Sequence, residues 1–354
     1  MDYHANDPRN FRHDNQKKTP HVKRRLLKQK LLRSIVLVFT VLLLVMAVFI
    51  FSEIAGSLAD LIKNNENGTK KPGNKSSEEP IVSSEDETGA SSQDPGPEYI
   101  TKSVSTDSYH AGELVLVNGT HKYEFPTSET NKLIEIYQYR ADSGSEVNYY
   151  KLKKSDMKLN RTAMTSLDAM MKNYYEATGD TTIMIRDAYR SYEDQEAKHS
   201  STKAGYSDHH TGYTVALSVY TENETSFDLN KDDPNHKWLY ENAYKYGFVE
   251  RYPAGKETKT GISNYTECFR YVGVLNAYLM KLGNYSMEEY IEYLEAHPYS
   301  GEHLTVTDEN GQAFELYYVP VSGEATTSIP VPKDHSYTIS GDNAGGFIVT
   351  VTLD

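Results

Sequence analysis

Cysteine is almost absent from this chain, since Cys268 is the only one among 354 residues. One thiol cannot form a disulfide within the chain, so a disulfide framework is excluded. Any extracellular part must therefore be stabilised by its own core. Tryptophan occurs once and phenylalanine 10 times, whereas tyrosine occurs 29 times. Tyrosine suits a surface that faces sugar or peptide, but a compositional habit explains the excess equally well.

Basic residues are also fewer than acidic ones, with 37 Lys and Arg against 50 Asp and Glu, which gives a net charge of −13. Residues 1–33 hold ten Lys or Arg and three Asp, a net charge of +7, which leaves −20 for the remaining residues. An acidic remainder disfavours nucleic-acid binding, because phosphate contacts need a basic surface. The length suits one or two globular domains with polar segments attached.

One long stretch lacks charge altogether: residues 34–52, SIVLVFTVLLLVMAVFIFS. A helix of this length spans about 29 Å, close to the hydrocarbon thickness of a bilayer. The segment therefore predicts an uncleaved transmembrane helix. A cleaved signal peptide is the alternative, because small residues follow in SEIAGSLAD.

Orientation follows from the basic residues before this helix, since Lys and Arg stay on the cytoplasmic side. Residues 1–33 are then a basic cytoplasmic tail, and the main domain lies outside the cell membrane of a single-pass protein. Residues 53–98 are rich in Ser, Glu, Asn, Gly and Pro, which predicts a disordered stalk.

A globular pattern begins near residue 99. Short apolar runs predict strands at 113–118, 181–190 and 213–220, and helical spacing predicts helices at 165–179, 234–247 and 271–283. Ser286 and Glu289 form a capping box for a further helix. Residues 99–299 are thus expected to form an α+β domain, and residues 300–354 a small β appendage.

Four segments carry the functional signal: DAYRSYEDQ (187–195), GYSDHHTGYTVA (205–216), WLYENAYKYGFVERYP (238–253) and TGISNYTECFRYVG (260–273). In this order they resemble the VanY-type zinc D-alanyl-D-alanine carboxypeptidases, over roughly residues 99–290. The resemblance implies a central antiparallel sheet with flanking helices. It also implies an ancestral activity, the removal of terminal D-Ala from peptidoglycan stem peptides.

The family's residues carry over only in part. Arg190 and Ser207 stand at the positions that hold the substrate, and His209 stands at the first zinc ligand. Ala216 replaces the aspartate that would be the second ligand. Tyr265 replaces the glutamate general base, and Cys268 replaces the histidine that would be the third ligand.

These replacements remove the chemistry that zinc hydrolysis needs. A catalytic zinc takes about three protein ligands and activates a water whose proton a carboxylate accepts. Ala216 has no lone pair, and a phenol such as Tyr265 is a poor base at neutral pH. His209 and Cys268 alone supply two ligands, so no zinc cofactor is expected.

Each of these residues can also have a purely structural role. Arg190 either grips a peptide carboxylate or makes a structural ion pair. His209 is expected to be a hydrogen-bonded relic or a substrate contact on a strand, and His210 a polar surface or turn residue. Cys268 is expected to be a small buried side chain. Three tyrosines either line the former cleft or pack in the core: Tyr206, Tyr213 and Tyr265.

The sequence thus favours a catalytically inactive, membrane-anchored homologue that binds peptidoglycan stem peptide or a protein partner in the cell envelope. The alternative is an active metallo-carboxypeptidase with a rebuilt zinc site, using His209, Cys268 and a third ligand from elsewhere. A purely structural role in the envelope is a third possibility.

Overall fold

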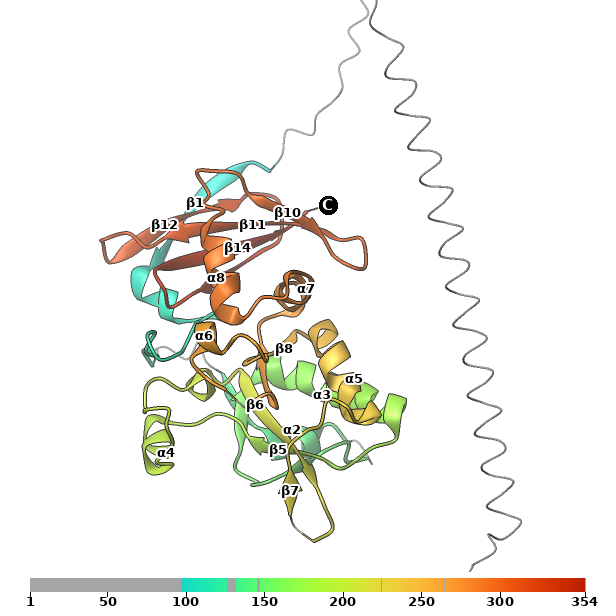
Figure 1. The fold of residues 1–354 in the computed structure, drawn as a ribbon. Coiled ribbons are helices and arrows are strands. Elements are labelled where there is room, and N and C mark those ends of the chain that lie inside the picture. Colours follow the sequence, from blue (N-terminus) through green and yellow to red (C-terminus); the bar gives the residue numbers. More distant parts are fainter. Residues whose placement is uncertain (1–96, 126–131, 145–146, 224, 264, 354) are drawn as a thin grey trace, which may run out of the picture. The chain divides into compact units, whose positions relative to one another are not determined.

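The computed structural model describes residues 97–125, 132–144, 147–223, 225–263 and 265–353 (Figure 1). The predicted tail (1–33), the apolar run (34–52) and almost all of the predicted stalk lie outside these residues. In the part that is described, no helix is both long and apolar enough to cross a bilayer. The transmembrane helix therefore stays a prediction.

A central sheet organises the domain, with strands in the order β3-β5-β6-β9-β8 and β7 paired to β6. All neighbours are antiparallel except β3 and β5, so the expected antiparallel sheet carries one parallel edge strand. The strands are β3 (Lys151–Leu152), β5 (Ile183–Asp187), β6 (Thr214–Tyr220), β7 (Ser226–Phe227), β8 (Phe248–Glu250) and β9 (Cys268–Tyr271).

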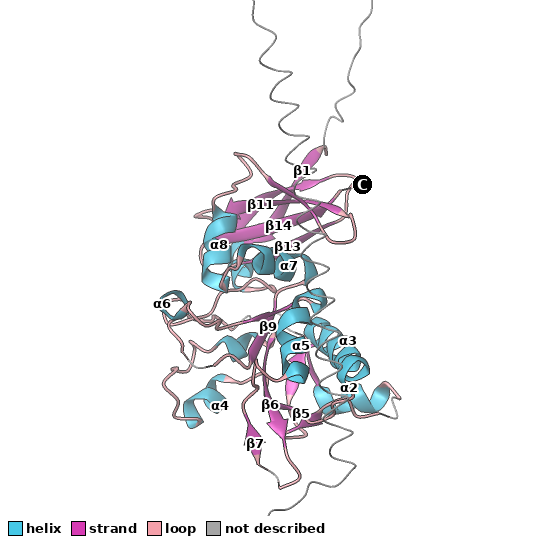
Figure 2. Ribbon diagram, turned by 45° about the vertical axis from the view of Figure 1, so that its right-hand side comes forward, coloured by secondary structure: helices cyan, strands magenta, loops and turns pink. Residues whose placement is uncertain are grey.

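Side-chain alternation gives the sheet two different faces, because successive residues of a strand point to opposite sides. Ile185, Leu217 and Phe269 belong to one buried core cluster together with Leu167 of α3 (Arg161–Thr178) and Leu239 of α5 (Pro234–Asn242). Figure 2 shows α3 and α5 side by side next to the strands. Ala216 and Cys268, the neighbours of Leu217 and Phe269 in the sequence, point to the opposite face of the sheet. The candidate site lies on that face.

Local signals explain where the helices begin and end. The Asn160 side chain accepts the Thr162 N–H and begins α3, which ends at Gly179 with φ of 71°. Asp233 caps α5 in the same way, and the chain continues as a 3-10 turn (Ala243–Tyr246). The Ser286–Glu289 capping box begins α8 (Met287–Glu295), as predicted.

Two predicted elements need correction. The helix expected from residue 271 begins later, as α7 (Val274–Gly283), because Tyr271 completes β9. Residues 113–118 form no strand in the described structure. The carbonyls of Glu113 and Val115 accept hydrogen bonds from the Arg270 side chain rather than from a neighbouring strand. A short apolar run can therefore be buried without any ladder partner when a guanidinium satisfies its backbone.

The smaller elements complete the main domain. A two-stranded sheet pairs β2 (Leu133–Glu135) with β4 (Lys158–Asn160). The short helices are α2 (Ile136–Asp142), α4 (Tyr192–Ala197) and α6 (Glu257–Thr260). These elements lead the chain into and out of the loops that line the candidate site.

The predicted C-terminal β segment is present as a sheet in the order β10-β11-β14-β13. Its strands are β10 (Leu304–Thr307), β11 (Ala313–Pro320), β13 (Tyr337–Gly341) and β14 (Gly346–Thr352). A further strand, β12 (Thr326–Pro332), pairs with β1 (Tyr99–Ser105), which sequence reasoning had assigned to the main domain. The β module, defined as β1 and β10–β14, is therefore built from both ends of the described chain (Figure 1).

Candidate functional site

The prediction that His209 lies on a strand is wrong. His209 lies in a 3-10 turn (Asp208–Thr211) that leads into β6. Its side chain is 2% exposed. Nδ1 lies 2.7 Å from the Ala188 carbonyl oxygen, and Nε2 lies 3.1 Å from the Tyr265 hydroxyl. A carbonyl can only accept, so Nδ1 carries the proton and Nε2 accepts the hydrogen bond of the phenol. The nitrogen that would be available to a metal is therefore engaged by Tyr265.

Electrostatics keep both members of this pair neutral. Burial, with the nearby Arg190 charge, lowers the pKa of His209 to about 3. Burial, reinforced by Cys268, raises the pKa of Tyr265 far above that of an ordinary phenol. At neutral pH the imidazole is unprotonated and the phenol keeps its proton. Tyr265 is consequently unsuited to act as a general base.

Ala216 and Cys268 lie directly opposite each other on β6 and β9. Both are fully buried, as expected for Cys268. Burial and the charge of Asp208 raise the pKa of the Cys268 thiol well above its usual value, so the thiolate that would bind a metal is disfavoured. The strand pairing thus brings together the two positions at which the resemblance implies zinc ligands, but Ala216 has no donor and the Cys268 thiol keeps its proton.

These residues do not fit a zinc ion. Within the described ranges, no group of three or more His, Cys, Asp or Glu side chains converges as metal ligands would. A structural or catalytic zinc needs three or four such donors. The third ligand that a rebuilt site requires is not among the described residues.

Two roles were open for Arg190 from the sequence, a structural ion pair and the binding of a peptide carboxylate, and the structure is compatible with both. Its Nε lies 3.1 Å from the Asp187 carboxylate, and its Nη1 hydrogen bonds to Gln195 and lies 3.4 Å from Ser207 Oγ. The structural ion pair is therefore present. The same residue also lines a cavity of about 390 Å³, so the guanidinium borders a space that a ligand can enter.

Asp187 stays ionised beneath this arginine. Burial opposes its charge, but its pKa is lowered to about 2, and at neutral pH the cations beside it are Arg190 and Lys198. Lys198 Nζ lies 2.6 Å from the same carboxylate oxygen that Arg190 contacts. Asp187 thus holds two cations at the wall of the cavity and fixes the orientation of Arg190.

Sequence reasoning missed Arg186 on β5. Its Nη2 lies 2.5 Å from Glu267 and its Nη1 lies 2.9 Å from Asp228. Its guanidinium also lies 5.8 Å from the centre of the Tyr265 ring. Glu267 stands where the resemblance to the VanY-type family implies a tryptophan. Because a buried carboxylate needs a cation, that replacement was the signal from which a partner could have been sought.

Tyr252 was missed as well. Its ring stacks on Tyr265 with a centroid distance of 5.7 Å and an interplanar angle of 13°. It also borders a second cavity, of about 380 Å³, together with Tyr206. Tyr265 therefore contacts one residue from each cavity, Arg186 in the first and Tyr252 in the second.

His210 corrects another expectation, because it is fully buried rather than on the surface. Its Nδ1 lies 2.8 Å from the Arg190 carbonyl, and its Nε2 accepts the Gly205 N–H at 3.0 Å. The two adjacent histidines thus fasten the 3-10 turn to the segment that carries Arg190. Of the three tyrosines, Tyr206 lines the second cavity, whereas Tyr213 packs against the main core.

An ion network lies beneath the turn. Asp208 accepts hydrogen bonds from Arg251 at 3.1 Å and from Arg270 at 2.8 Å. Arg251 also pairs with Glu288 of α8 at 2.8 Å. Burial alone would raise the pKa of Asp208, but the two arginines lower it to about 2. This network holds the His209 turn against β9 and α8.

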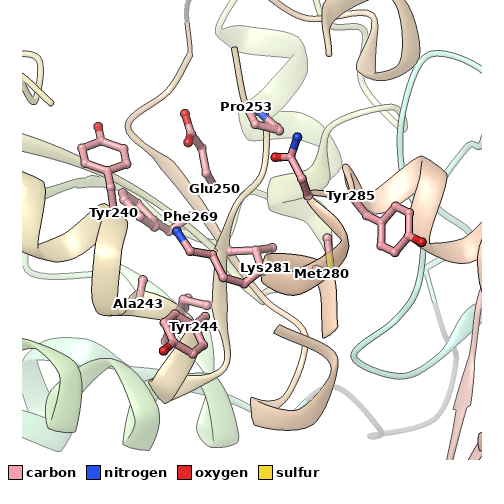
Figure 3. Close-up of a pocket in the computed structure, with 12 residues that line it drawn as sticks. Tyr240, Ala243, Tyr244, Glu250, Pro253, Phe269, Met280, Lys281 and Tyr285 are labelled. Atoms are coloured by element: carbon pink, nitrogen blue, oxygen red, sulfur yellow. The ribbon is translucent and has the colours of Figure 1, made fainter. Parts of the chain in front are cut away.

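A third cavity, of about 120 Å³, lies elsewhere in the domain (Figure 3). Its walls come from α5, β8, β9 and α7, and they include Tyr240, Glu250, Phe269 and Lys281. Phe269 follows Cys268 directly on β9 and so points to the opposite face of the sheet. This cavity is therefore separated by the sheet from the positions that resemble a catalytic centre.

Comparisons with known proteins agree on one family. The family model described as "VanY: D-alanyl-D-alanine carboxypeptidase" matches residues 156–274. A D-alanyl-D-alanine carboxypeptidase of Enterococcus faecium is 30% identical over 257 residues, which cover 71% of this chain and 78% of that protein. One from Enterococcus faecalis (strain ATCC 700802 / V583) is 33% identical over 87 residues, covering 25% of this chain and 30% of that protein.

Among solved structures, the vancomycin-resistance D,D-dipeptidase VanXYg, in complex with a D-Ala-D-Ala phosphinate analogue, is similar with a TM-score of 0.61. The similarity covers 72% of this chain and 100% of that chain, at 23% sequence identity. At this level of identity the likeness concerns the fold. It confirms the mixed α/β architecture that the sequence predicted.

Proposed function

Because the chain belongs to the VanY-type D-alanyl-D-alanine carboxypeptidase family, we propose that it is a non-hydrolysing member that binds D-Ala-terminated peptides. We further propose that it is anchored in the cell membrane by residues 34–52, with the described domain outside. A protein partner in the envelope would use the same surface.

One observation carries the proposal: the hydrogen bond between His209 Nε2 and the Tyr265 hydroxyl. A single phenol proton takes the lone pair that a metal would need. Tyr265 also stands where the resemblance implies the glutamate general base. A phenol with a raised pKa does not accept a proton at neutral pH, so Tyr265 does not replace that base. Binding without turnover is what remains available to such a site.

Recognition would rest on Arg190. Its guanidinium is held in place by Asp187 and Gln195, and it borders the 390 Å³ cavity. An arginine fixed in this way can receive a carboxylate with little loss of side-chain freedom. Ser207 lies beside it and offers a hydroxyl to the same ligand. The terminal carboxylate of a peptide is the group that fits this pair.

The test combines metal analysis, turnover and binding on the purified full-length chain. We expect no zinc above background and no release of D-Ala from acetyl-Lys-D-Ala-D-Ala. We expect the same peptide to bind in calorimetry, and Arg190→Ala to weaken binding about ten-fold or more, as for loss of a charge-assisted hydrogen bond. Arg190→Lys keeps the charge and serves as the control, and the melting temperature of each variant reports its folding.

Stoichiometric zinc together with release of D-Ala would establish the rebuilt metallo-carboxypeptidase instead. Peptide binding that is equal in the native chain and in a folded Arg190→Ala variant would remove Arg190 from the binding site. Absence of any peptide binding would contradict the proposed recognition and leave a protein partner or a structural role.

A further inference from the structure

The cavity beside Arg190 is lined by an excess of cationic side chains. Five come from Lys or Arg and three from Asp, in a chain whose net charge is −13. The cations are Lys153, Lys154, Arg186, Arg190 and Lys198, and the acids are Asp156, Asp187 and Asp194. A concave wall with an excess of one sign of charge attracts ligands of the opposite sign.

Most of these charges already have partners. Asp187 holds Arg190 and Lys198, and Arg186 pairs with Glu267 and Asp228. Asp194 accepts the Ser191 N–H as part of the capping box of α4.

Two cations and one carboxylate of the wall remain, Lys153, Lys154 and Asp156, which lie in one loop and have a net charge of +1. Among the described residues, no carboxylate lies within ion-pair distance of Lys153 or Lys154. Both lysines are in the loop between β3 and β4, on the wall of the cavity contributed by a different segment from Arg190. The cavity thus presents cations on two walls, and a terminal carboxylate on Arg190 would use only one of them.

We propose that Lys153 and Lys154 bind a second carboxylate of the same ligand, so that the site selects acidic peptides. The inference rests on the proposed function, because it takes Arg190 as the contact for the terminal carboxylate. A cavity of about 390 Å³ holds a few residues of a peptide, so the second carboxylate belongs to a residue shortly before the terminal D-Ala.

The experiment compares matched peptides that differ by one charge. Acetylated peptides ending in D-Ala-D-Ala carry Glu at one of the three preceding positions, and each has a twin with Gln in its place. Binding to the full-length chain is measured by calorimetry at low ionic strength, where charge interactions are least screened. We expect the best Glu peptide to bind about two- to five-fold more tightly than its twin, as for an exposed ion pair.

Two variants assign the effect. Lys153→Gln with Lys154→Gln is expected to remove the preference, so that each Glu peptide and its Gln twin bind this variant with equal affinity. Lys172→Gln with Lys237→Gln makes the same change in net charge on α3 and α5, on exposed side chains, and is expected to keep the preference.

The outcomes separate the two proposals. Equal affinity for every pair of twins would overturn the second-carboxylate site and leave the proposed function standing. A preference that persists without the two lysines would overturn their assignment. Failure of every peptide to bind would overturn both proposals together.

Discussion

At the scale of single residues, Ala216 and Cys268 stand at two positions where the family resemblance implies zinc ligands, and these positions lie together but lack metal donors. Ala216 and Cys268 still face each other across β6 and β9, and His209 still hydrogen bonds through Nδ1 to a carbonyl. That carbonyl contact is the kind of outer partner that orients a metal-binding imidazole. What separates the site from a metal centre is therefore a small number of side chains rather than a change of fold.

Restoring the donors should restore metal binding. Ala216→Asp and Cys268→His supply two ligands beside His209, and Tyr265→Glu removes the phenol that occupies the lone pair of His209. We expect about one zinc per chain by elemental analysis, and a melting temperature that rises on addition of zinc, because a ligand that binds only the folded state stabilises it. The same variant without Ala216→Asp is the control and is expected to bind zinc more weakly. A folded triple variant that takes up no zinc would contradict this explanation.

Glu113 gives a second test at this scale. Burial raises its pKa to about 7, although Arg270 opposes the shift. An unfolded glutamate titrates near 4.3, so between about pH 4.3 and 7 the folded state binds more protons than the unfolded state. The free energy of unfolding should therefore fall as the pH rises through this window, by up to about 1.4 kcal/mol per pH unit.

Glu113→Gln should remove this dependence. We expect the variant to gain stability relative to the native chain at pH 8 but not at pH 4, measured by urea unfolding. Glu176→Gln changes a carboxylate that is 57% exposed and should leave the pH dependence intact. An unchanged slope in Glu113→Gln would show that other groups cause it.

At the scale of elements, the sequence predicted best where a local signal decides the structure. The predicted Ser286–Glu289 box begins α8. The helix predicted at 165–179 ends at Gly179, and the helix predicted at 234–247 begins after the cap residue Asp233. The strand expected at 113–118 failed, because its apolar pattern reports burial and cannot report that arginine side chains satisfy its carbonyls.

In the candidate site, too, local motifs were predictable from the sequence, whereas contacts between distant residues were not. The replacements proposed at 216, 265 and 268, and the role proposed for His209, follow from the resemblance of short sequence motifs alone. The contact between Tyr265 and His209 joins residues 56 positions apart, and the pair of Arg186 with Glu267 joins residues 81 apart. Such contacts depend on sheet register, which a single sequence does not specify.

The pairing of β1 with β12 supplies a prediction at the element scale. The Lys333 N–H bonds to Glu98 O, and the Thr106 N–H bonds to Ala325 O. Antiparallel pairs alternate, so the even-numbered residues of β1 bond to β12 and the odd-numbered residues face away. Pro330 and Pro332 agree with this pattern, because they lie opposite Thr101 and Tyr99, at positions where no N–H is needed.

A matched pair of proline substitutions tests this register. Lys102→Pro removes an N–H that bonds to β12 and should destabilise the fold by about 1–3 kcal/mol, because a carbonyl of β12 loses its donor. Thr101→Pro removes an N–H that faces away and should cost clearly less, as on the open side of an edge strand. Thermal unfolding measures both. Equal losses in the two variants would contradict the register.

At the scale of the whole molecule, membrane attachment is the open prediction, because residues 34–52 lie outside the described part of the chain. Deletion of residues 34–52 should move the protein from the membrane pellet to the soluble fraction after cell lysis. A variant that lacks residues 63–81 instead is the control of equal length and should remain in the pellet. Recovery of the native chain in the soluble fraction would exclude the anchor.

The mixed origin of the β module has a practical consequence for handling the protein. The first and last described strands, β1 and β14, both belong to this module, whereas Arg190 and the first two cavities belong to the central-sheet domain. A tag or surface linkage placed at the C-terminus would hold the molecule by its β module. A protein immobilised on a sensor through its C-terminus would leave Arg190 and the two cavities free to contact a peptide solution that flows over the surface.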